Sequence, residues 1–597
     1  MRFPLIPHLL LALAATAFAQ SGRDWPVYNG GADGLHASRL TQINRRNVAR
    51  LTLAWQFDTG EKGGIQTNPL ILNGVLYAAT PSAKIVALNA ATGRQLWRFS
   101  SGIPSSQPVR GLSYWTDGAH PRLFVGIMNF LYCLDAKTGQ PVSTFGVAGR
   151  VDLREGLRGD PAKQSIALTT PGAIYKNLII VGGRNPEAHP APPGDIRAYD
   201  VRTGQLRWSF HTIPHPGEPG YETWPADAWQ SSGAANNWAG MSVDTEHGIV
   251  YVPTGSAVMD FYGGDRHGDN LYANTLLALD AETGKRLWHF QGVHHDIWDR
   301  DFPAAPVLFT ARRNGRAIPA LAQTTKQGYV YVFNRLTGQP LFPIHEVPYP
   351  KSTVPGEAAS PTQPKPDLPA PFARQSLTAA DLTNRTPEAH AWAQQAFAKL
   401  ASDGQYIPFS LDKQTIVLPG FDGGAEWGGP AIDPRTNILY VNANEMAWTG
   451  GLEPATLRGS AGQQIYARQC ALCHRLDRSG SPPAFPSLLD LDKRMGRDKI
   501  VDVILHGSGR MPGSPNLTTP QLNALISYLR TGDAGEGSAS NAGNAINAGS
   551  ASKSQTSTKS EMAAAQSDAN AEPYLFTGYR KFLDPDGYPA IAPPWGT

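Results

Sequence analysis

Cysteine is scarce in this chain, and its distribution excludes a disulfide framework. Three cysteines occur in 597 residues. Cys470 and Cys473 fall within one short motif, which leaves Cys133 alone in an apolar stretch. We interpret Cys133 as a small buried hydrophobe rather than a functional thiol.

Long apolar runs and an excess of one charge are also absent. Beyond the N-terminus, no stretch approaches the ~18 apolar residues of a membrane helix, so we expect no membrane span in the mature chain. The net charge is only +3, which gives no reason to expect a nucleic-acid partner. Glycine (61 residues) and proline (50 residues) are frequent, whereas charged residues make up 17% of the chain. This composition favours turn-rich β structure over a helical bundle.

The N-terminus has the pattern of an export signal. Residues 1–19 contain Arg2, an apolar run at residues 9–15, and the small-x-small sequence Ala17-Phe18-Ala19. The run is too short to cross a bilayer, so the pattern predicts a cleaved signal peptide. We therefore expect a periplasmic protein; an N-terminal core helix is the alternative.

A turn motif recurs through the first three quarters of the chain. Each copy combines an apolar strand, an Asp or Asn, two residues, Thr-Gly, and often an aromatic shortly afterwards. Its glycines are Gly93, Gly139, Gly204, Gly284 and Gly338, and a degenerate copy lies near Asp433. The aromatics that can pack between neighbouring sheets are Trp97, Trp208, Trp288 and Phe342. One hairpin cannot bury its apolar face alone, so the repeats predict an all-β propeller of stacked blades.

The turn motif resembles that of the pyrroloquinoline quinone (PQQ) dehydrogenases, and the chain is most similar to their glucose-dehydrogenase-like branch. The resemblance covers residues 25–448 and resumes at Pro573; its most specific stretches are VHHDIWDRDFPAAP and TTKQGYVYVFNR. It implies a propeller of the eight-bladed type, the cofactor PQQ with a Ca²⁺ or lanthanide ion, and a small-molecule sugar or alcohol substrate.

The same resemblance implies a catalytic centre. Asp299, directly after Trp298, matches the catalytic aspartate, and Lys326 matches the basic residue beside the quinone oxygens. The implied metal ligands are Glu187, Asp299 and Asp301. These residue types suit the chemistry, because alcohol oxidation needs a base for the hydroxyl proton and a hard cation needs oxygen ligands. A surface cluster at the end of a strand is the alternative interpretation of the acidic segment around Asp299.

Further residues match positions that contact the cofactor. Trp238 matches the flat platform beneath the quinone, although a core tryptophan is the alternative. The other matching positions are Arg110, Thr169, Thr170, Lys326, Glu426 and Trp427.

The chain also departs from the family pattern. Ser256 stands where alcohol-oxidising relatives have a metal-binding asparagine, so we expect a remodelled metal shell. Adjacent cysteines above the cofactor are missing, and Ser105, Ser106 and Gln107 occupy the place where the glucose branch can use a histidine. The upper wall of the site therefore stays unassigned.

A second, all-α domain is predicted at residues 459–532. The stretch GQQIYARQCALCH reads as a helix that delivers a C-x-x-C-H motif. Cys470 and Cys473 are expected to form thioethers to a covalent haem c, with His474 as the proximal iron ligand. A redox or zinc pair is the alternative, but no second Cys/His pair follows at zinc spacing. The arrangement resembles a small class I cytochrome c module.

The sixth iron ligand is expected to be a methionine sulfur. Met511 lies in a loop rich in glycine and proline before a predicted helix at residues 521–529. Met495, in a charged stretch, is the competitor.

The predicted order is a signal peptide (1–19), a propeller (20–458), the cytochrome c domain (459–532), a low-complexity linker (533–571) and a return to the propeller (572–597). Relatives continue into further blade sequence after the last segment. We therefore expect an open ring, a ring completed by a second chain, or one that closes with fewer blades. Residues 381–402 are expected to form a helical insertion, either a lid over the site or a surface excursion.

Together these features predict a PQQ-dependent dehydrogenase that oxidises a sugar or alcohol and passes electrons through its own haem to an external cytochrome or quinone. The alternatives are a non-catalytic PQQ-like scaffold and a fragment with only electron-carrier activity. Glu187, Trp238, Asp299 and Lys326 favour the enzyme, because a scaffold has no need of this set.

Overall fold

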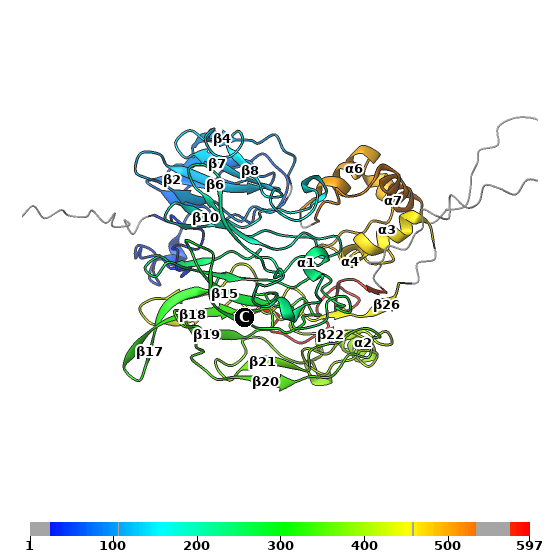
Figure 1. The fold of residues 1–597 in the computed structure, drawn as a ribbon. Helices are drawn as coiled ribbons and strands as arrows, with labels where there is room; N and C mark the ends of the chain where they lie inside the picture. Colours follow the sequence, from blue (N-terminus) through cyan, green and yellow to red (C-terminus); the bar gives the residue numbers. More distant parts are fainter. Residues whose placement is uncertain (1–23, 106, 456–458, 510, 533–572) are drawn as a thin grey trace, which may run out of the picture.

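The computed structural model describes residues 24–105, 107–455, 459–509, 511–532 and 573–597. The predicted signal peptide, Ser106 and the predicted linker at 533–571 lie outside these residues. Figure 1 shows a stack of β-sheets with a group of helices against one side.

The first part of the chain forms four consecutive antiparallel sheets of four strands each. Their strands are β1 (Leu70–Leu72), β2 (Val75–Ala79), β3 (Ile85–Asn89), β4 (Gln95–Phe99), β5 (Ser113–Trp115), β6 (Arg122–Ile127), β7 (Phe130–Asp135), β8 (Arg150–Asp152), β9 (Ala173–Tyr175), β10 (Leu178–Val181), β11 (Ile196–Asp200), β12 (Leu206–Phe210), β13 (Ser242–Asp244), β14 (Ile249–Pro253), β15 (Thr275–Asp280) and β16 (Arg286–Gln291). Each strand pairs with the next one in sequence, which is the topology expected of propeller blades.

Smaller sheets follow. They contain β17 (Val307–Arg313), β18 (Arg316–Thr324), β19 (Val330–Asn334), β20 (Ile344–Pro348), β21 (Thr362–Pro366), β22 (Thr415–Val417), β23 (Ala431–Asp433), β24 (Ile438–Tyr440), β25 (Trp448–Gly450), β26 (Leu452–Pro454), β27 (Tyr574–Phe576) and β28 (Arg580–Lys581). The first strands of the sheets that begin with β5, β9, β13, β17 and β23 touch in this order, so these blades stack side by side. The propeller predicted from the repeats is confirmed.

Tryptophans lock neighbouring blades together at the predicted turns. A Cβ atom added at Gly93, Gly139 or Gly284 would lie 2.5 Å from the indole ring of Trp55, Trp97 or Trp208, respectively, so only glycine permits this contact. Each of the three indole N–H groups also donates to a carbonyl of the turn that it covers: those of Ala90, Ala136 and Ala281. Trp97 and Trp208 therefore play the part predicted for them.

The chain returns to the propeller after the helical insertion. β28 pairs with β25, and β27 pairs with β26, so residues on either side of the insertion share two sheets. Beyond β28 the backbone N–H of Glu445 donates to Trp595, and that of Thr383 donates to Ala590. The predicted return of the chain is thus seen in the strand pairing, while the three expected outcomes for the ring stay predictions.

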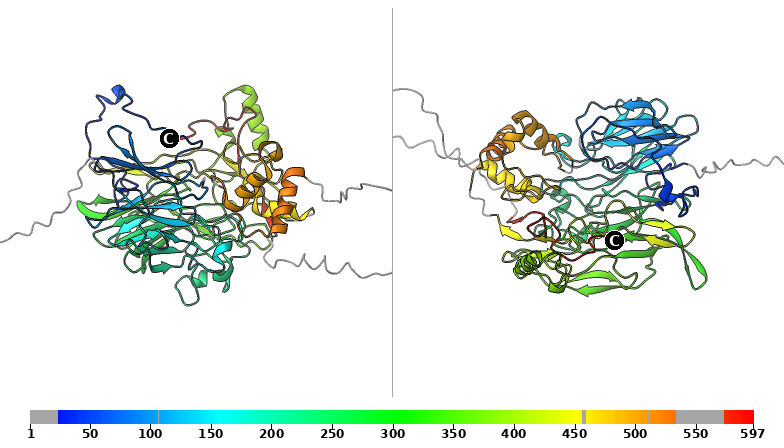
Figure 2. Two further views of the ribbon diagram at one scale, coloured as in Figure 1. Left: turned by 90° about the horizontal axis from the view of Figure 1, so that it is seen from above. Right: turned by 180° about the vertical axis from the view of Figure 1, so that it is seen from behind.

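The insertion is a compact helical module with its own core. Its helices are α3 (Ala461–Gln469), α4 (Ala471–His474), α5 (Leu491–Arg494), α6 (Arg497–His506) and α7 (Thr519–Thr531). α3 and α7 cross closely at Gly462, where an added Cβ would lie 2.0 Å from the carbonyl oxygen of Ala524. Thr518 and Gln521 form a capping box at the start of α7, which extends the helix predicted at 521–529 by two residues at each end. Figure 2 shows this module from above and from behind.

Short helices complete the fold. They are η1 (Val48–Arg50), η2 (Pro161–Lys163), η3 (Tyr221–Thr223), α1 (Ala228–Ser231), η4 (Ala379–Asp381) and α2 (Pro387–Phe397). α2 confirms the predicted helical insertion. The ring of Trp392 in α2 lies beside that of Phe582 in the returning segment, with ring centroids 6.1 Å apart. In the part of the chain described here, no helix is long and apolar enough to cross a membrane.

Candidate redox site

One cavity lies between the propeller and the helical module, and its lining draws on both. The propeller contributes Arg110, Glu187, Trp238, Asp299, Asp301, Lys326, Glu426 and Trp427. The module contributes Cys470, Cys473, His474 and Met511. All the predicted site residues except Thr169 and Thr170 therefore line the same cavity. No residue of α2 lines it, which favours a surface excursion over a lid.

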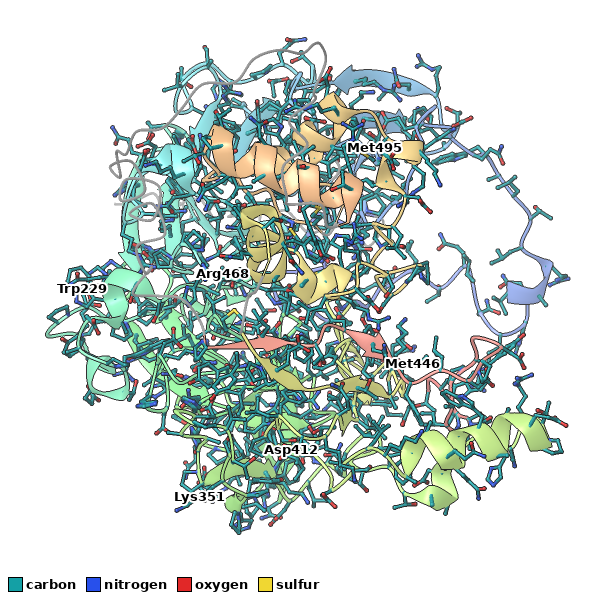
Figure 3. All side chains as sticks on the ribbon, turned by 90° about the vertical axis from the view of Figure 1, so that its right-hand side faces the viewer. Trp229, Lys351, Asp412, Met446, Arg468 and Met495 are labelled. Atoms are coloured by element: carbon teal, nitrogen blue, oxygen red, sulfur yellow. The ribbon has the colours of Figure 1, made fainter. Side chains whose placement is uncertain are left out.

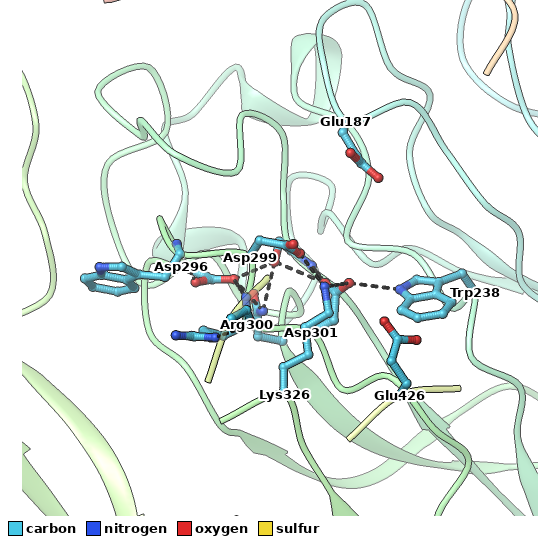
Figure 4. Close-up of polar contacts among 12 residues, drawn as sticks. Glu187, Trp238, Asp296, Asp299, Arg300, Asp301, Lys326 and Glu426 are labelled. Atoms are coloured by element: carbon cyan, nitrogen blue, oxygen red, sulfur yellow. Dashed lines mark hydrogen bonds and ion pairs between the residues drawn. The ribbon is translucent and has the colours of Figure 1, made fainter. Parts of the chain in front are cut away.

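Lys326 is the centre of a buried charge network (Figure 4). Its Nζ lies 2.7 Å from Oδ1 of Asp299 and 3.1 Å from Oδ2 of Asp301. Burial by itself would lower the pKa of Lys326, but the negative charges of Asp299, Asp301 and Glu426 outweigh it and raise the pKa well above its usual value. Lys326 is therefore a fixed cation that faces the cavity.

The two aspartates differ in their surroundings. Burial raises the pKa of Asp299 well above its usual value, and the charges of Asp301 and Glu187 add to this against the pull of Lys326. Burial would also raise the pKa of Asp301, but Lys326 and the backbone N–H of Ser256 lower it. Asp299 further adopts a left-handed backbone conformation, with φ +57°, which non-glycine residues rarely adopt. Such strain is typical of functional positions and makes Asp299 the distinctive carboxylate of the pair.

Trp238 is held from both sides. Its indole N–H donates to Oδ2 of Asp301 at 3.0 Å, and its carbonyl accepts from the hydroxyl of Thr170 at 2.6 Å. The Arg110 guanidinium lies 5.4 Å from the Trp238 ring centroid and 5.1 Å from that of Trp427. The indole therefore has a fixed orientation at the cavity wall.

Thr169 and Thr170 lie behind Arg110 rather than at the cavity. Both hydroxyls accept hydrogen bonds from Nη1 of Arg110, at 2.8 and 3.4 Å. In this structure they hold Arg110 in place, and their direct contact with a cofactor stays a prediction.

Ser256 and Asp296 form a supporting layer beneath the network. The Ser256 hydroxyl donates to Asp296 and accepts from the amide of Asn274 at 3.2 Å, while its backbone N–H donates to Asp301 at 2.7 Å. Asp296 also accepts from the backbone N–H groups of Trp298 and Arg300. Within the acidic segment, Asp296 thus shapes the turn that presents Asp299 and Asp301.

The two histidines of this segment point elsewhere. His295 is buried in an ion pair with Glu357 at 2.8 Å, and His294 contacts Gln291 and Glu346. Neither lines the cavity.

Among the cavity residues that the sequence analysis did not identify are Asp260 and Tyr579. Asp260 follows β14 and is 4% exposed; burial, together with the charges of Asp299, Glu187 and Asp301, raises its pKa well above the usual value. Tyr579, in the returning segment, donates its hydroxyl to Oε2 of Glu187 at 3.3 Å. Neither belongs to a repeat or a motif, so no sequence signal identified them.

The donor set suits a cation, although the carboxylates do not converge tightly. The buried Asp260 and the half-buried Glu187 have no cationic partner within the described part of the chain, and uncompensated carboxylates of this kind favour a metal ion. Glu187 stands apart from the Lys326 network in Figure 4. Among the described residues, one group of three possible metal ligands has its ligand atoms within 4.8 Å of one another: Asp244, Glu246 and His247. The cavity carboxylates form no such group. Asp244 there is paired with Arg335, so that group is an ordinary turn.

The helical module presents its haem motif to the same cavity. His474 donates its Nδ1 hydrogen to the carbonyl of Pro486 at 2.9 Å, which leaves Nε2 as the nitrogen available to iron. Met511 lines the cavity with His474. Met495, labelled on the helical module in Figure 3, instead packs against the core of the module. This placement supports Met511 as the sixth ligand.

The unassigned upper wall is formed by the module itself. The Gln107 amide donates to the carbonyl of Met511 at 2.8 Å, and its oxygen accepts from Arg184 at 3.2 Å. On the other side, the Phe485 ring stacks on Tyr579, with ring centroids 5.3 Å apart. Gln107, one of the residues at the position where the glucose branch can use a histidine, therefore contacts the helical module.

The third cysteine is remote from this cavity. Cys133 is fully buried in β7, where burial raises the pKa of its thiol to about 12. The interpretation of Cys133 as a small hydrophobe is consistent with this position.

Comparisons with known proteins agree with this geometry. Residues 25–477 match the family described as glucose/ethanol/alcohol dehydrogenase, beta-propeller domain, and residues 458–529 match cytochrome C oxidase, cbb3-type, subunit III. The chain is 34% identical over 455 residues to the quinate/shikimate dehydrogenase (quinone) of Acinetobacter baylyi, covering 70% of this chain and 56% of that protein. It is 33% identical over 488 residues to quinoprotein glucose dehydrogenase A of Acinetobacter calcoaceticus, covering 74% and 60%, respectively.

The fold is also found among solved structures. The quinohemoprotein alcohol dehydrogenase of Comamonas testosteroni superposes with a TM-score of 0.57 at 23% identity, covering 75% of this chain and 62% of that one. The chain thus spans roughly three fifths of the length of such proteins. Since the match to the propeller family extends over most of the sequence, this chain belongs to the PQQ-dependent dehydrogenase β-propellers and carries a cytochrome c domain.

Proposed function

We propose that this protein is a periplasmic quinohaemoprotein dehydrogenase that oxidises a sugar or alcohol and passes the electrons through its own haem to an external cytochrome or quinone. The observation that carries the proposal is the shared cavity. The Asp299–Lys326–Asp301 network and the Cys470–Cys473–His474 motif line one cavity, as a transfer between two redox groups within one chain requires.

The residues of the propeller fit PQQ. Trp238 offers a fixed flat face, Arg110 and Lys326 offer cations for the anionic groups of a quinone tricarboxylate, and Glu187, Asp299 and Asp301 offer oxygen ligands for Ca²⁺ or a lanthanide. When bound, PQQ supplies a two-electron acceptor for the C–H bond of the substrate, and the metal ion supplies a Lewis acid.

Asp299 is the proposed general base. The hydroxyl proton of the substrate moves to a carboxylate oxygen of Asp299 as the C–H bond is oxidised. Lys326 holds this carboxylate in position through the 2.7 Å contact and adds positive charge at the cavity floor. Asp301 fixes Trp238 through the 3.0 Å hydrogen bond, so one acidic segment positions both the base and the platform.

The helical module is the proposed electron exit. Cys470 and Cys473 would hold a haem covalently, and His474 and Met511 would ligate its iron, which accepts electrons one at a time. Gln107 and Tyr579 hold this module at the mouth of the quinone site.

A spectroscopic titration tests the proposed function. The protein is produced in the periplasm of a host that attaches haem, and its spectrum is followed as PQQ, then Ca²⁺ or La³⁺, and then a panel of sugars and alcohols are added. We expect reduced haem bands only when PQQ, a metal ion and a substrate are all present. If dithionite reduces the haem but no substrate does, the proposal is wrong, and the protein is an electron carrier or a scaffold instead.

A further inference from the structure

The loop that carries Met511 forms a tight turn after α6. Ser508 and Met511 exchange two backbone hydrogen bonds, of 3.0 and 2.9 Å. Gly507 permits the turn, because its φ is +79° and an added Cβ would lie 2.4 Å from the carbonyl oxygen of Met511. A carbonyl oxygen has two lone pairs, and the N–H of Ser508 uses one of them. The module thus shapes the turn and leaves the Met511 carbonyl able to accept a second hydrogen bond.

The propeller supplies the second donor. Gln107 lies in the loop between β4 and β5, and its Nε2 donates to the carbonyl of Met511 at 2.8 Å. Arg184, which follows β10, donates from Nη1 to Oε1 of the same glutamine at 3.2 Å. A guanidinium can only donate, so it orients the amide with its oxygen toward Arg184 and its NH₂ group toward Met511. Two propeller side chains therefore act in series on the backbone of the proposed iron ligand.

The backbone around both propeller residues is fixed by hydrogen bonds between neighbouring segments. The N–H of Arg184 donates to the carbonyl of Ala167 at 2.7 Å, and the N–H of Ala167 donates back at 3.0 Å. Three residues beyond Gln107, the N–H of Arg110 donates to the carbonyl of Thr169 at 2.9 Å. Because Gln107 is only 4% exposed, loss of its partner would leave a buried amide unsatisfied. The contact is therefore a specific link between the propeller and the Met511 turn.

On the basis of the proposed function, in which Met511 ligates the haem iron, we propose that Gln107 and Arg184 are positioning residues for this ligand. Gln107 holds the backbone of Met511, and Arg184 orients Gln107, so the propeller favours the bond from the methionine sulfur to iron. A thioether ligand raises the potential of a haem. The propeller thereby favours electron uptake by the module that is docked on it.

Titration of the ferric, full-length, haem-containing protein with imidazole tests this assignment. Imidazole reaches the iron by displacing the methionine sulfur, so its apparent Kd falls when the methionine is held less firmly. Gln107→Leu removes the hydrogen bond to Met511, and we expect the imidazole Kd to fall about twofold to tenfold, the usual worth of one hydrogen bond. The absorbance spectrum of the haem follows the titration.

Two variants of Arg184 test the second step. Arg184→Leu leaves Gln107 in place but removes the donor that orients its amide, so we expect a smaller fall in the imidazole Kd than in Gln107→Leu. Arg184→Lys retains a charged donor and should bring the Kd back toward the wild-type value.

Gln66→Leu is the matched control. Gln66 also lines the cavity, but within the described part of the chain it makes no hydrogen bond to Met511. Its imidazole Kd should equal that of the wild type. The melting temperature of each variant reports whether it is folded.

The outcomes separate this inference from the proposed function. An unchanged imidazole Kd in Gln107→Leu and Arg184→Leu, or an equal fall in Gln66→Leu, would overturn the positioning role while leaving the haem ligands as proposed. An equal Kd in the wild type and Met511→Ala would instead overturn Met511 as the ligand, and with it both the haem ligation in the proposed function and this inference.

Discussion

The quinone site and the haem site share one cavity but are built in different ways. The residues of the proposed quinone site come from several blades and loops spread between Arg110 and Trp427. The proposed haem attachments and the proposed proximal histidine lie within residues 470–474, at the junction of α3 and α4. The first site is a network of buried charges, whereas the second is supported by the apolar core of one small module.

This difference predicts different responses to mutation. In the quinone site, Lys326 connects two aspartates, so the loss of one charge changes the electrostatics of the others. In the haem module, the motif is local, and damage is expected to stay within the module. The four predictions below test this contrast, beginning with the largest expected effect.

Loss of the proposed base should separate the two sites most clearly. Asp299→Asn removes the carboxylate that lies 2.7 Å from Lys326 and should slow substrate-dependent haem reduction by roughly 10²- to 10⁴-fold, the usual contribution of a general base. Stopped-flow absorbance of the haem measures this rate. The dithionite-reduced spectrum should not change.

A surface carboxylate provides the control for that experiment. Asp117→Asn alters an exposed residue paired with His120, outside the cavity, and should leave the rate as in the wild type. A normal rate in Asp299→Asn would show that another group takes the proton.

Paired core substitutions test whether the two regions unfold separately. Leu525 in α7 and Leu321 in β18 are both almost fully buried, in the core of the module and of the propeller, respectively. Replacement of either by alanine should cost about 2–5 kcal/mol of unfolding free energy. We expect Leu525→Ala to lower mainly the melting temperature that is measured by haem absorbance. Leu321→Ala should lower mainly the melting temperature that is measured by far-ultraviolet circular dichroism. Equal shifts of both signals in both variants would mean that the propeller and module form one cooperative unit.

The proposed iron ligand can be tested by comparing two methionines. Met511→Ala should lower the midpoint potential of the haem by on the order of 0.1 V, because a thioether ligand raises it, within the ~0.8 V range that axial ligands span. Met495→Ala, which alters only the core of the module, should leave the potential nearly unchanged. Redox titration distinguishes the two, and the reverse result would make Met495 the ligand.

The smallest effect is expected where the two sites touch. Tyr579→Phe removes the 3.3 Å hydrogen bond to Glu187 but keeps the ring that stacks on Phe485. We expect the metal affinity to fall by about 0.5–1.5 kcal/mol, with no change in haem potential.

Tyr574→Phe, in the same segment, is the control for Tyr579→Phe. Its hydroxyl makes no hydrogen bond among the described residues, so the metal affinity should stay the same. A shifted haem potential in Tyr579→Phe would instead place the main role of this hydroxyl on the haem side.

Features that depend on residues close together in the chain could be predicted well from the sequence. The Thr-Gly turns, with an Asp or Asn side chain accepting backbone N–H groups as Asp135 does, follow from short-range chemistry. The packing of Trp97 between neighbouring sheets was expected from the repeat, whereas the structure shows that its ring lies against Gly139. Phe342, the aromatic of the last regular copy, instead lies beneath the Arg313 guanidinium, at 5.9 Å.

Long-range contacts could not be predicted in the same way. Gln107 contacts Met511 across 404 positions of sequence, and Tyr579 contacts Glu187 across 392. No periodicity relates such pairs, so Tyr579 and Asp260 were missed. Thr169 and Thr170 hold Arg110 through its guanidinium, a contact that the sequence did not predict, and their expected contact with the cofactor stays a prediction.

The sequence by itself determined the repeated blades, the haem motif and the chemical types of the site residues, because each depends on neighbours within a few positions. Only the tertiary structure decided that these residues meet in one cavity, that the helical module closes its upper wall, and that Asp260 is left without a partner. The physical reason is that burial and charge pairing depend on the three-dimensional surroundings of a side chain, which are formed by segments far apart in the chain.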